Sequence, residues 1–376
     1  MIFDNTIHSA EDARRVAKRR LPWMVFDYID GAAGSELGAV RNRKALDGIK
    51  LMPRILRDVS SRSLSTELFG VSADCPFGIA PMGMCNLSAP GADLMLARLA
   101  ARKKVPLGVS TVASTSMEDI IEVAEGHAWF QLYFSGDGSG SFKLVERAKH
   151  AGYRTLVLTV DVPELGRRSR ELRRGFKMPF RIGPRQFLDF ACHPRWSLKT
   201  LFSGAPEMAN FATPGYEFDR TESRAKATWD TLSELRARWD GKLVVKGVLN
   251  AEDALKLKEQ GVDAVQVSNH GARQLESAPS PIEVLPEMRT ALGEEFPLFF
   301  DSGIRSGEDL LRVLVSGADF AFVGRILQFA IAAGGERGLE QIWELLEKEL
   351  SGAMAMVGMT KIGRQTSHQA GRSHSS

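Results

Sequence analysis

The chain has 376 residues, of which 44% are hydrophobic and 25% charged, as is ordinary for a globular protein with a sizeable core. This composition excludes a disordered or collagen-like chain, and three cysteines (Cys75, Cys85 and Cys192) are too few for a disulfide-stapled fold. The cysteines also lack the spacing of a zinc site, so we expect no metal and a reducing compartment. The N-terminal residues lack the apolar region of a signal peptide, and no apolar run is long enough to cross a membrane, so a cytoplasmic location is expected.

The net charge of +3 is too small to indicate nucleic-acid binding, but it is concentrated in one segment. Residues 173–199 contain a single acid, Asp189, and seven basic side chains: Arg173, Arg174, Lys177, Arg181, Arg185, Arg195 and Lys199. This segment therefore carries the whole positive excess of the chain.

Hydrophobic periodicity predicts a helix over residues 9–30 and, after a glycine-containing turn, a second helix over 36–48. From residue 77 onward, short apolar runs alternate with amphipathic helical patterns. Runs that are apolar throughout are typical of strands buried on both faces, as in parallel sheets. The expected strands are 77–82, 106–111, 129–133, 155–161, 243–247, 264–269, 297–303 and 320–325, and the helices are 91–103, 116–124, 140–150, 224–238, 250–259, 281–292 and 306–315.

Eight strands alternating with helices over about 250 residues predict an α/β fold, a TIM (β/α)8 barrel with N-terminal helices. A doubly wound Rossmann sheet is disfavoured because no G-x-G-x-x-G turn follows an early strand. Some eighty residues separate the fourth strand from the fifth, far more than a usual connection. We therefore expect one domain over 1–360, with an inserted segment over 170–222, and a disordered tail over 361–376.

Polar residues follow most of the predicted strands, at the end of a TIM barrel where active sites lie. From the second strand to the eighth, these residues are Ser110, Thr111, Gln131, Tyr133, Thr159, Asp161, Lys246, Ser268, Asn269, His270, Asp301, Gly324 and Arg325. Polar groups at so many strand ends predict one large, polar-edged ligand in the mouth of the barrel.

The last two strands lead into a pattern typical of phosphate binding. Gly303 and Arg305 follow the seventh strand, and Gly324 and Arg325 follow the eighth. Glycine lets backbone N–H groups approach an anion, and arginine offers a planar fork of donors. The alternative is that these glycines only form turns and the arginines only lie at the surface.

Titratable residues at the same end of the barrel indicate acid–base chemistry. His270 can titrate near neutral pH, and Asp161 can orient its imidazole, although a lone histidine can also be structural. Arg273 can hold a substrate carboxylate, and Arg167 and Arg168 supply further cationic groups. Lys246 can form a Schiff base, stabilise a developing anion, or pair with a nearby acid. The site thus has a base and anion holders, with no metal cluster.

Several motifs make the chain similar to a known family. They are YIDGAAG (28–34), APMGM (80–84), WFQLY (129–133), LTVDVPELGRR (158–168), LVVKG (243–247), SNHGARQL (268–275), DSGIRSGED (301–309) and VGR (323–325). Over about residues 10–355 the chain resembles the FMN-dependent α-hydroxy-acid dehydrogenases and oxidases. Its HPRWSL (193–198) and ANF (209–211) segments, and DSG in place of the more usual DGG, resemble the (S)-mandelate dehydrogenase branch.

The resemblance implies a role for each matching position. His270 would be the base and Asp161 its partner, with Tyr28, Tyr133, Arg168 and Arg273 binding the substrate. Lys246 would stabilise the reduced flavin. The flavin ring would contact Ala80, Pro81, Met82, Ser110, Gln131 and Thr159; the ribityl chain Asp301; and the phosphate Gly303, Arg305, Gly324 and Arg325. Met82 replaces a usual threonine, so a hydroxyl contact to the flavin is lost there.

The activity that the resemblance implies is FMN-dependent oxidation of a mandelate-like or lactate-like (S)-2-hydroxy acid to the 2-oxo acid. The family commonly forms tetramers, so the resemblance also implies a homotetramer. Electrons would pass to a membrane quinone; the alternative is a soluble oxidase that uses O2 and produces H2O2. An FMN-dependent isomerase is disfavoured because it needs no substrate-carboxylate arginines such as Arg168 and Arg273. An inactive flavin-binding scaffold is disfavoured by the intact set of His270, Asp161 and Arg273.

The inserted segment combines its basic residues with Phe176, Phe180, Phe187, Phe190, Trp196 and Phe202. A cationic, aromatic segment suits an interface with anionic lipids, which predicts peripheral attachment to the inner face of the cell membrane through 173–204. The alternative is that these aromatic residues form a small core or an oligomer contact.

Overall fold

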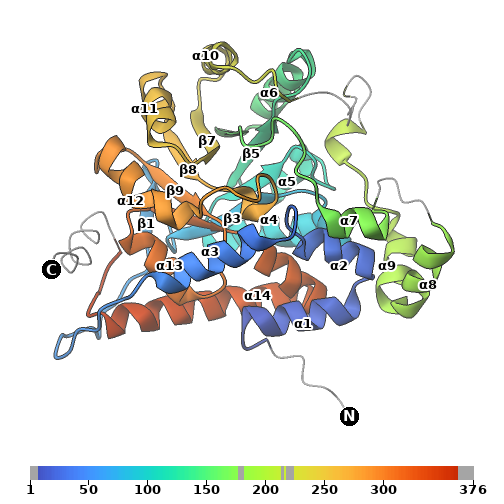
Figure 1. The fold of residues 1–376 in the computed structure, drawn as a ribbon, viewed down its shortest axis with the longest axis horizontal. Helices are drawn as coiled ribbons and strands as arrows, with labels where there is room; N and C mark the ends of the chain where they lie inside the picture. The colour runs from blue at the N-terminus through green and yellow to red at the C-terminus, as the bar shows by residue number, and fades with distance from the viewer. Residues whose placement is uncertain (1–6, 177–181, 213–215, 217–223, 363–376) are drawn as a thin grey trace.

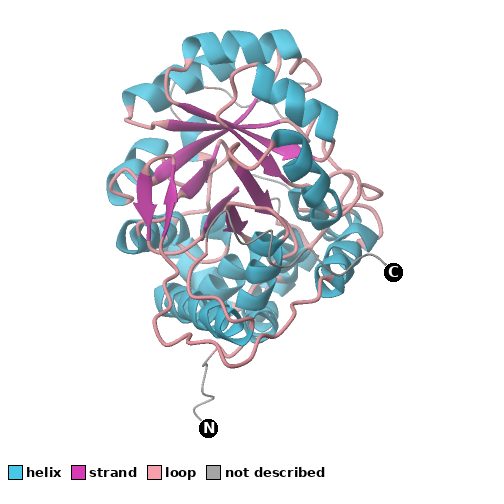
Figure 2. Ribbon diagram, turned by 90° about the vertical axis from the view of Figure 1, so that its left-hand side faces the viewer, coloured by secondary structure: helices cyan, strands magenta, loops and turns pink. Residues whose placement is uncertain are grey.

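The computed structural model describes residues 7–176, 182–212, 216 and 224–362. Eight parallel strands close into a barrel in the order β10-β3-β4-β5-β6-β7-β8-β9, inside a layer of helices (Figure 2). The strands are β3 (Phe77–Met82), β4 (Leu107–Ser110), β5 (Ala128–Tyr133), β6 (Thr155–Thr159), β7 (Lys242–Val248), β8 (Ala264–Val267), β9 (Leu298–Asp301) and β10 (Phe320–Val323). The predicted TIM barrel is confirmed, and each strand ends within two residues of its predicted bounds.

The helices around the barrel are α4 (Ala92–Lys103), α5 (Met117–Val123), α6 (Ser139–His150), α10 (Trp229–Arg238), α11 (Ala251–Glu259), α12 (Pro281–Leu292) and α13 (Gly307–Val315). Some of them begin where a side chain accepts a hydrogen bond from the first turn. Ser116 and Ser306, for example, accept the backbone N–H groups of Asp119 and Asp309, respectively. The helix expected from residue 224 starts only at Trp229, because Thr228 forms its N-cap.

The N-terminal region differs from the predicted single helix over 9–30. It forms α1 (Ala10–Arg20) and α2 (Trp23–Asp30), because Pro22 lacks the N–H that a continuous helix would need. Helix α3 (Leu37–Gly48) follows as expected. Helix α1 lies beside the long C-terminal α14 (Arg325–Met356), which the sequence pattern does not single out (Figure 1).

A short hairpin closes the N-terminal end of the barrel. Strands β1 (Thr66–Leu68) and β2 (Val71–Ala73) are joined through Phe69 and Gly70, both with positive φ, as a tight hairpin turn requires. The Phe69 ring packs 5.8 Å from Trp129 and 5.6 Å from Phe299, between ring centroids. This end of the barrel is therefore filled by aromatic side chains.

The inserted segment is anchored to the N-terminal helices. It contains α7 (Ser169–Arg174), α8 (Pro184–Cys192) and α9 (Pro194–Ser203), beside α2 in Figure 1. The Asp189 carboxylate accepts the backbone N–H groups of Trp23 and Met24 at the start of α2, at 3.0 and 3.3 Å. The Trp196 indole donates to the Leu87 carbonyl at 2.7 Å. Asp189, the single acid of the basic segment, therefore caps the N-terminus of α2.

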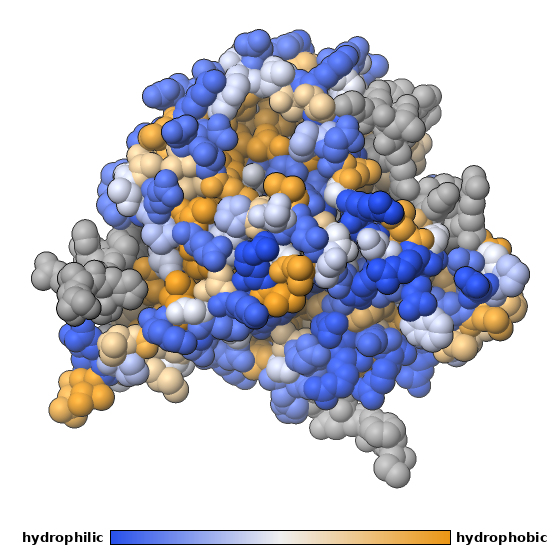
Figure 3. Space-filling view, in the orientation of Figure 1, coloured by the Kyte–Doolittle hydropathy of each residue, from blue (hydrophilic) through white to orange (hydrophobic). Residues whose placement is uncertain are grey.

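The aromatic residues of this segment divide between interior and surface. Trp196 is buried and packs against Phe190, whereas Phe187 is 65% and Phe202 86% exposed. Hydrophobic surface lies over α8 and α9 at the right-hand edge of Figure 3, next to hydrophilic surface. A small core and an exposed apolar face therefore coexist. Phe180 and the predicted tail beyond residue 362 fall outside the described residues. Within the described ranges, no helix is long and apolar enough to cross a membrane.

Candidate active site

A cavity of about 590 Å³ lies at the C-terminal ends of the strands and brings together residues from across the sequence. All but four of the predicted site residues line it. Those that do are Tyr28, Ala80, Pro81, Met82, Tyr133, Arg168, Lys246, His270, Arg273, Asp301, Gly303, Arg305, Gly324 and Arg325. The four others, Ser110, Gln131, Thr159 and Asp161, lie behind this lining.

Three of those four form part of a buried polar layer at the ends of β4, β5 and β6. The Gln131 amide donates to the Thr159 hydroxyl at 3.0 Å, and the Ser110 hydroxyl accepts the backbone N–H of Val112 at 3.3 Å. Gln131 and Thr159 are 1% and 4% exposed. Their polar atoms are satisfied within the protein, which fixes the floor below the cavity.

His270 lies between a carboxylate and a phenol. Its Nδ1 is 3.0 Å from Asp161 Oδ1, and its Nε2 is 3.3 Å from the Tyr133 hydroxyl. Asp161 fixes one ring nitrogen as a donor, which leaves Nε2 as the acceptor on the side of the cavity. Two predicted partners, 109 residues apart in the chain, are thus in direct contact.

The charge states of this pair suit a base. Burial lowers the pKa of His270, although the Asp161 charge opposes this effect. The pKa of Asp161 is also lowered: burial opposes this shift, but the charges of His270 and Lys246 outweigh burial. At neutral pH the imidazole is therefore unprotonated beside an ionised carboxylate.

The two arginines predicted to bind a substrate carboxylate both form an ion pair with the same carboxylate of the protein, that of Glu171. Arg168 Nη1 and Arg273 Nη2 lie 3.2 and 3.0 Å from the same oxygen of Glu171. Arg273 also donates to the carbonyl of Tyr28 at 2.8 Å, and its guanidinium lies over the Tyr28 ring. Sequence reasoning does not single out Glu171; its signal is an acid within the arginine-rich run 167–174. Glu171 holds both guanidinium groups at one side of the cavity.

Lys246 is paired with an acid, which is one of the three alternatives that the sequence left open. Its ammonium lies 2.9 Å from the Ser268 hydroxyl and 3.3 Å from Asp301. Burial lowers the pKa of Lys246, but Asp301, Asp161 and Tyr133 together outweigh burial and raise it. The side chains of Gln266, Ser268 and Ser302 also donate to Asp301, so its carboxylate contacts four side chains, including Lys246. This ammonium is a buried, fixed positive charge at the end of β7.

Arg305 and Arg325 face the cavity with partners that carry no charge. Arg305 donates to the carbonyl of Ile304, and Arg325 donates to those of Gly31 and Gly271. Among the described residues, neither has a carboxylate within ion-pair distance. Burial, and then the charge of Arg43, lower the pKa of Arg305 to about 10; burial, and then Arg305, lower that of Arg325 to about 9.

The lining of the whole cavity is strongly cationic. It includes seven arginine and lysine side chains but only two carboxylates, those of Glu171 and Asp301. An uncompensated buried charge is costly, so this arrangement fits a bound anion. Gly303, with φ of +92°, lies beside Arg305 where a phosphate could approach the backbone. The residues present therefore fit a large phosphorylated cofactor such as FMN.

One wall of the cavity is apolar. It is formed by Val162, Leu165, Leu172, Phe176 and Met208. Phe176 stacks on Tyr28 with ring centroids 4.5 Å apart. Leu165 and Leu172 are 52% and 62% exposed, so the wall continues to the protein surface next to the inserted helices. The cavity thus has a cationic side and an apolar side.

Comparison with known proteins places these features in a family. Residues 17–371 match the sequence model of the FMN-dependent dehydrogenases. The chain is 38% identical to (S)-mandelate dehydrogenase of Pseudomonas putida over 96% of this chain and 93% of that protein. It is 37% identical to L-lactate dehydrogenase of Pseudomonas aeruginosa, over 95% and 96% of the two chains.

Solved structures give the same result. The fold matches the monotopic membrane protein (S)-mandelate dehydrogenase with a TM-score of 0.89 and 37% identity, over 95% of this chain and 96% of that one. A mandelate oxidase matches with a TM-score of 0.83 and 36% identity, over 96% and 98% of the two chains. The chain belongs to the family of FMN-dependent dehydrogenases, and FMN is its cofactor.

Proposed function

We propose that the protein oxidises an (S)-2-hydroxy acid to the 2-oxo acid. The observation that carries this proposal is the placement of His270, held by Asp161, in one cavity with the paired guanidinium groups of Arg168 and Arg273. A base beside a carboxylate-binding site suits a substrate that carries a hydroxyl next to a carboxylate. The similarity to mandelate and lactate dehydrogenases supports the same reaction.

In this proposal, the substrate carboxylate binds to Arg168, Arg273 and the Tyr28 hydroxyl. Nε2 of His270 accepts one proton from the substrate, and Asp161 stabilises the imidazolium that forms. The Tyr133 hydroxyl, 3.3 Å from Nε2, hydrogen-bonds the substrate hydroxyl and orients it toward His270.

FMN, when bound, accepts the two electrons and the remaining proton that leave the substrate. Arg305, Arg325, Gly303 and Gly324 would hold its phosphate, and Asp301 its ribityl chain. Ala80, Pro81, Met82, Ser110, Gln131 and Thr159 would surround its ring. The buried ammonium of Lys246 would stabilise negative charge on the reduced ring.

The apolar wall favours a substrate with a bulky, mandelate-like side chain over lactate. Val162, Leu165, Phe176 and Met208 offer more apolar surface than a methyl group can cover. Anaerobic mixing of the FMN-loaded protein with (S)-mandelate and with (S)-lactate tests both proposals. We expect bleaching of the flavin absorbance with both acids, faster with mandelate. No bleaching by either acid would contradict the proposed reaction.

We further infer that a membrane quinone accepts the electrons and that the protein attaches to the inner face of the cell membrane. The exposed Phe187, Leu201 and Phe202 are interspersed with basic residues such as Arg195 and Lys199, as suits anionic lipid. The apolar cavity wall reaches the surface near the same helices, which suits an apolar acceptor. The likeness to a monotopic membrane protein supports this attachment.

Point variants test membrane attachment better than deletion of the inserted segment, because the deletion would also remove the contacts that Asp189 and Trp196 make with the rest of the protein. The double variant Phe187→Ser/Phe202→Ser should lose co-sedimentation with vesicles that contain anionic lipid, while (S)-mandelate still reduces its flavin. Val71→Ser, at a 57% exposed apolar residue of β2, is the matched control and should sediment like the unaltered protein. Equal sedimentation of all three proteins would contradict the inferred attachment.

A soluble oxidase that produces H2O2 is the second candidate, and the likeness to mandelate oxidase favours it. Admission of air to the substrate-reduced protein separates the two functions. Slow reoxidation by O2 with rapid reoxidation by a water-soluble quinone supports the dehydrogenase. Rapid reoxidation with stoichiometric H2O2 supports the oxidase. The homotetramer stays a prediction, which sedimentation velocity of the FMN-loaded protein tests.

A further inference from the structure

Helix α3 faces the site with a stripe of three buried residues spaced four apart: Gly38, Asn42 and Leu46. A Cβ on Gly38 would lie 3.1 Å from that of Ala272, so the helix is closely packed on the turn that follows His270. At the other end of the stripe, a Cβ on Gly303 would lie 2.9 Å from Leu46. One helix outside the barrel therefore contacts both the loop of His270 and the loop of Gly303.

The middle residue of the stripe is polar and forms a reciprocal amide pair. Asn42 Nδ2 donates to Asn269 Oδ1 at 2.8 Å, and Asn269 Nδ2 donates to Asn42 Oδ1 at 2.7 Å. The two side chains are 2% and 5% exposed. A buried amide is costly unless its donors and acceptors are satisfied, and this pair satisfies both side chains.

Asn269 in turn holds a strained stretch of backbone. His270, Gly271 and Ala272 have φ of +59°, +63° and +62°, which is unfavourable for the two residues with side chains. Asn269 Oδ1 accepts the backbone N–H of Ala272 at 3.1 Å. Backbone strain of this kind persists only where surrounding contacts fix it. The hydroxyls of Ser268 and Ser302 fix the other two residues by accepting the N–H groups of His270 and Gly271.

We propose that Asn42 is a positioning residue: through Asn269, it holds the left-handed turn that aims His270 at the substrate. Asn42 does not line the cavity, so it acts without touching substrate or cofactor. The inference rests on the proposed role of His270. Displacement of a catalytic group by about 1 Å can slow a reaction on the order of 100-fold, so a distant amide can control the rate.

The test compares Asn42→Ala, Asn269→Ala and the double variant as FMN-loaded proteins. Asn250→Ala, which removes the exposed N-cap of α11 and does not alter the cavity lining, is the control for a simple loss of stability. We expect Asn42→Ala to keep FMN but to slow flavin reduction by (S)-mandelate about 10- to 100-fold, with KM changed less than kcat. Asn250→Ala should keep the rate of the unaltered protein.

The double variant should be no slower than Asn269→Ala alone, because both substitutions remove the same connection. Additive losses, or an unaltered rate in Asn42→Ala together with a lowered melting temperature, would overturn the inference. If Asn42→Ala does not retain FMN, Asn42→Asp replaces it: it keeps the size of the side chain and loses the donor to Asn269. An unaltered rate in Asn42→Asp would overturn the inference equally.

The proposed function has its own control in this experiment. His270→Ala should abolish flavin reduction whatever Asn42 does. If His270→Ala reduces normally, the proposed reaction mechanism fails; if only the Asn42 variants reduce normally, the positioning role alone fails.

Discussion

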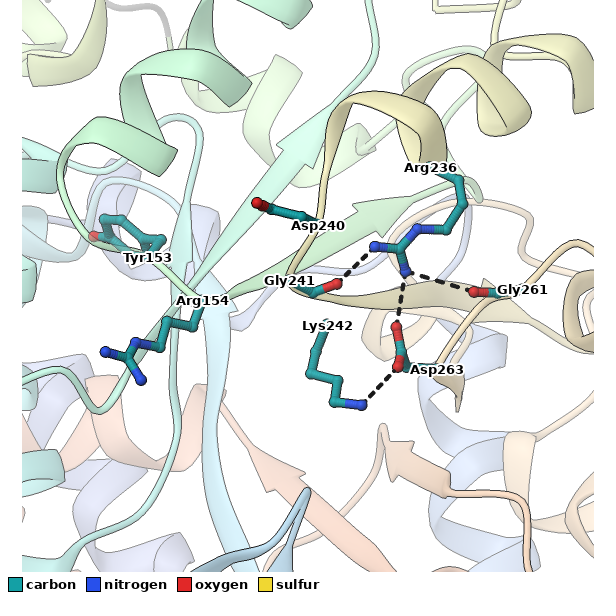
Figure 4. Close-up of a pocket in the computed structure, with 8 residues that line it drawn as sticks. All are labelled: Tyr153, Arg154, Arg236, Asp240, Gly241, Lys242, Gly261 and Asp263. Carbon is teal, nitrogen blue, oxygen red and sulfur yellow. Dashed lines mark hydrogen bonds and ion pairs between the residues drawn. The ribbon is translucent and has the colours of Figure 1, made fainter.

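The two ends of the barrel differ in how their charged side chains are paired. The N-terminal face has a hollow of about 500 Å³, whose charged lining comprises three cations and two carboxylates (Figure 4). There Arg236 lies 2.9 Å from Asp263 and donates to the carbonyl of Gly241, and Lys242 lies 2.9 Å from the same carboxylate. At the C-terminal mouth, seven cations face two carboxylates, and within the described ranges the guanidinium groups of Arg305 and Arg325 donate to backbone carbonyls and form no ion pair.

This difference separates charges that stabilise the fold from charges that serve a ligand. At the N-terminal face, Arg236, Lys242 and the backbone N–H of Leu243 satisfy the Asp263 carboxylate. Burial opposes ionisation of Asp263, but Lys242 and the backbone of Leu243 lower its pKa. At the mouth, burial of excess positive charge destabilises the protein alone and would favour the binding of anions, such as the proposed FMN phosphate and substrate carboxylate.

The largest expected effect comes from the pair at the centre of the mouth. Burial lowers the pKa of His270, so kcat/KM should fall as pH decreases through a pKa below the ordinary value of about 6.5, where the imidazole becomes protonated. Asp161 raises that pKa, so Asp161→Asn should shift the acidic limb to still lower pH. The rate should also fall about 10²- to 10⁴-fold, because the imidazolium loses its partner. An unchanged pH profile of kcat/KM would contradict this assignment.

Arg273 should have the next largest effect. Arg273→Met removes one of the two guanidinium groups proposed to bind the substrate carboxylate and leaves Glu171 with one guanidinium fewer. We expect kcat/KM for (S)-mandelate to fall about 10²- to 10³-fold, as for loss of a buried charged hydrogen bond. A variant with unaltered kcat/KM in steady-state assays would show that the substrate carboxylate binds elsewhere.

Arg325 should separate cofactor affinity from stability. Because burial lowers its pKa to about 9, the charged guanidinium is disfavoured in the folded apoprotein. Arg325→Met should therefore weaken FMN binding about 10- to 100-fold without lowering the melting temperature of the apoprotein. Fluorescence titration with FMN and thermal unfolding of deflavinated protein measure the two quantities. Lower apoprotein stability with unaltered FMN affinity would show that Arg325 stabilises the fold rather than binding the cofactor, contrary to the proposed difference between the two ends.

Arg236 should have the smallest effect on activity. Arg236→Met removes a partly exposed ion pair and the bonds to nearby carbonyls, which should cost about 1–2 kcal/mol of unfolding free energy. It should leave flavin reduction and FMN affinity unaltered. Denaturant titration and the anaerobic assay check both expectations, and a loss of kcat/KM would indicate that the N-terminal face also serves the reaction.

The barrel could be predicted from the sequence because its strands are buried on both faces. Continuous apolar runs such as 77–82 and 320–325 mark strand positions directly, and their polar ends then locate the mouth. The break at Pro22 and the hairpin at Phe69 depend on single turns, to which hydrophobic periodicity is insensitive. Helix α14 is buried on much of its surface, which weakens the amphipathic signal that identifies surface helices.

Site residues that follow strands could be predicted from the sequence, whereas residues that reach the site from distant segments could not. Asp161 and His270 both follow strands, so barrel geometry predicts their proximity. Glu171, in the inserted segment, and Asn42, on an outer helix, reach the site only through tertiary packing. The sequence signal for Glu171 is its place in an arginine-rich run, and sequence spacing carries no signal for the contact of Asn42 with Asn269.

The most direct measurement is anaerobic stopped-flow reduction of the bound flavin by (S)-mandelate, in the unaltered protein and in His270→Ala. If the cationic mouth holds FMN and a 2-hydroxy acid beside His270, the unaltered protein should bleach rapidly. His270→Ala should remain yellow, bind FMN with unaltered affinity, and bleach at least about 10²-fold more slowly. Equal bleaching rates for the two proteins would contradict the central role given to His270.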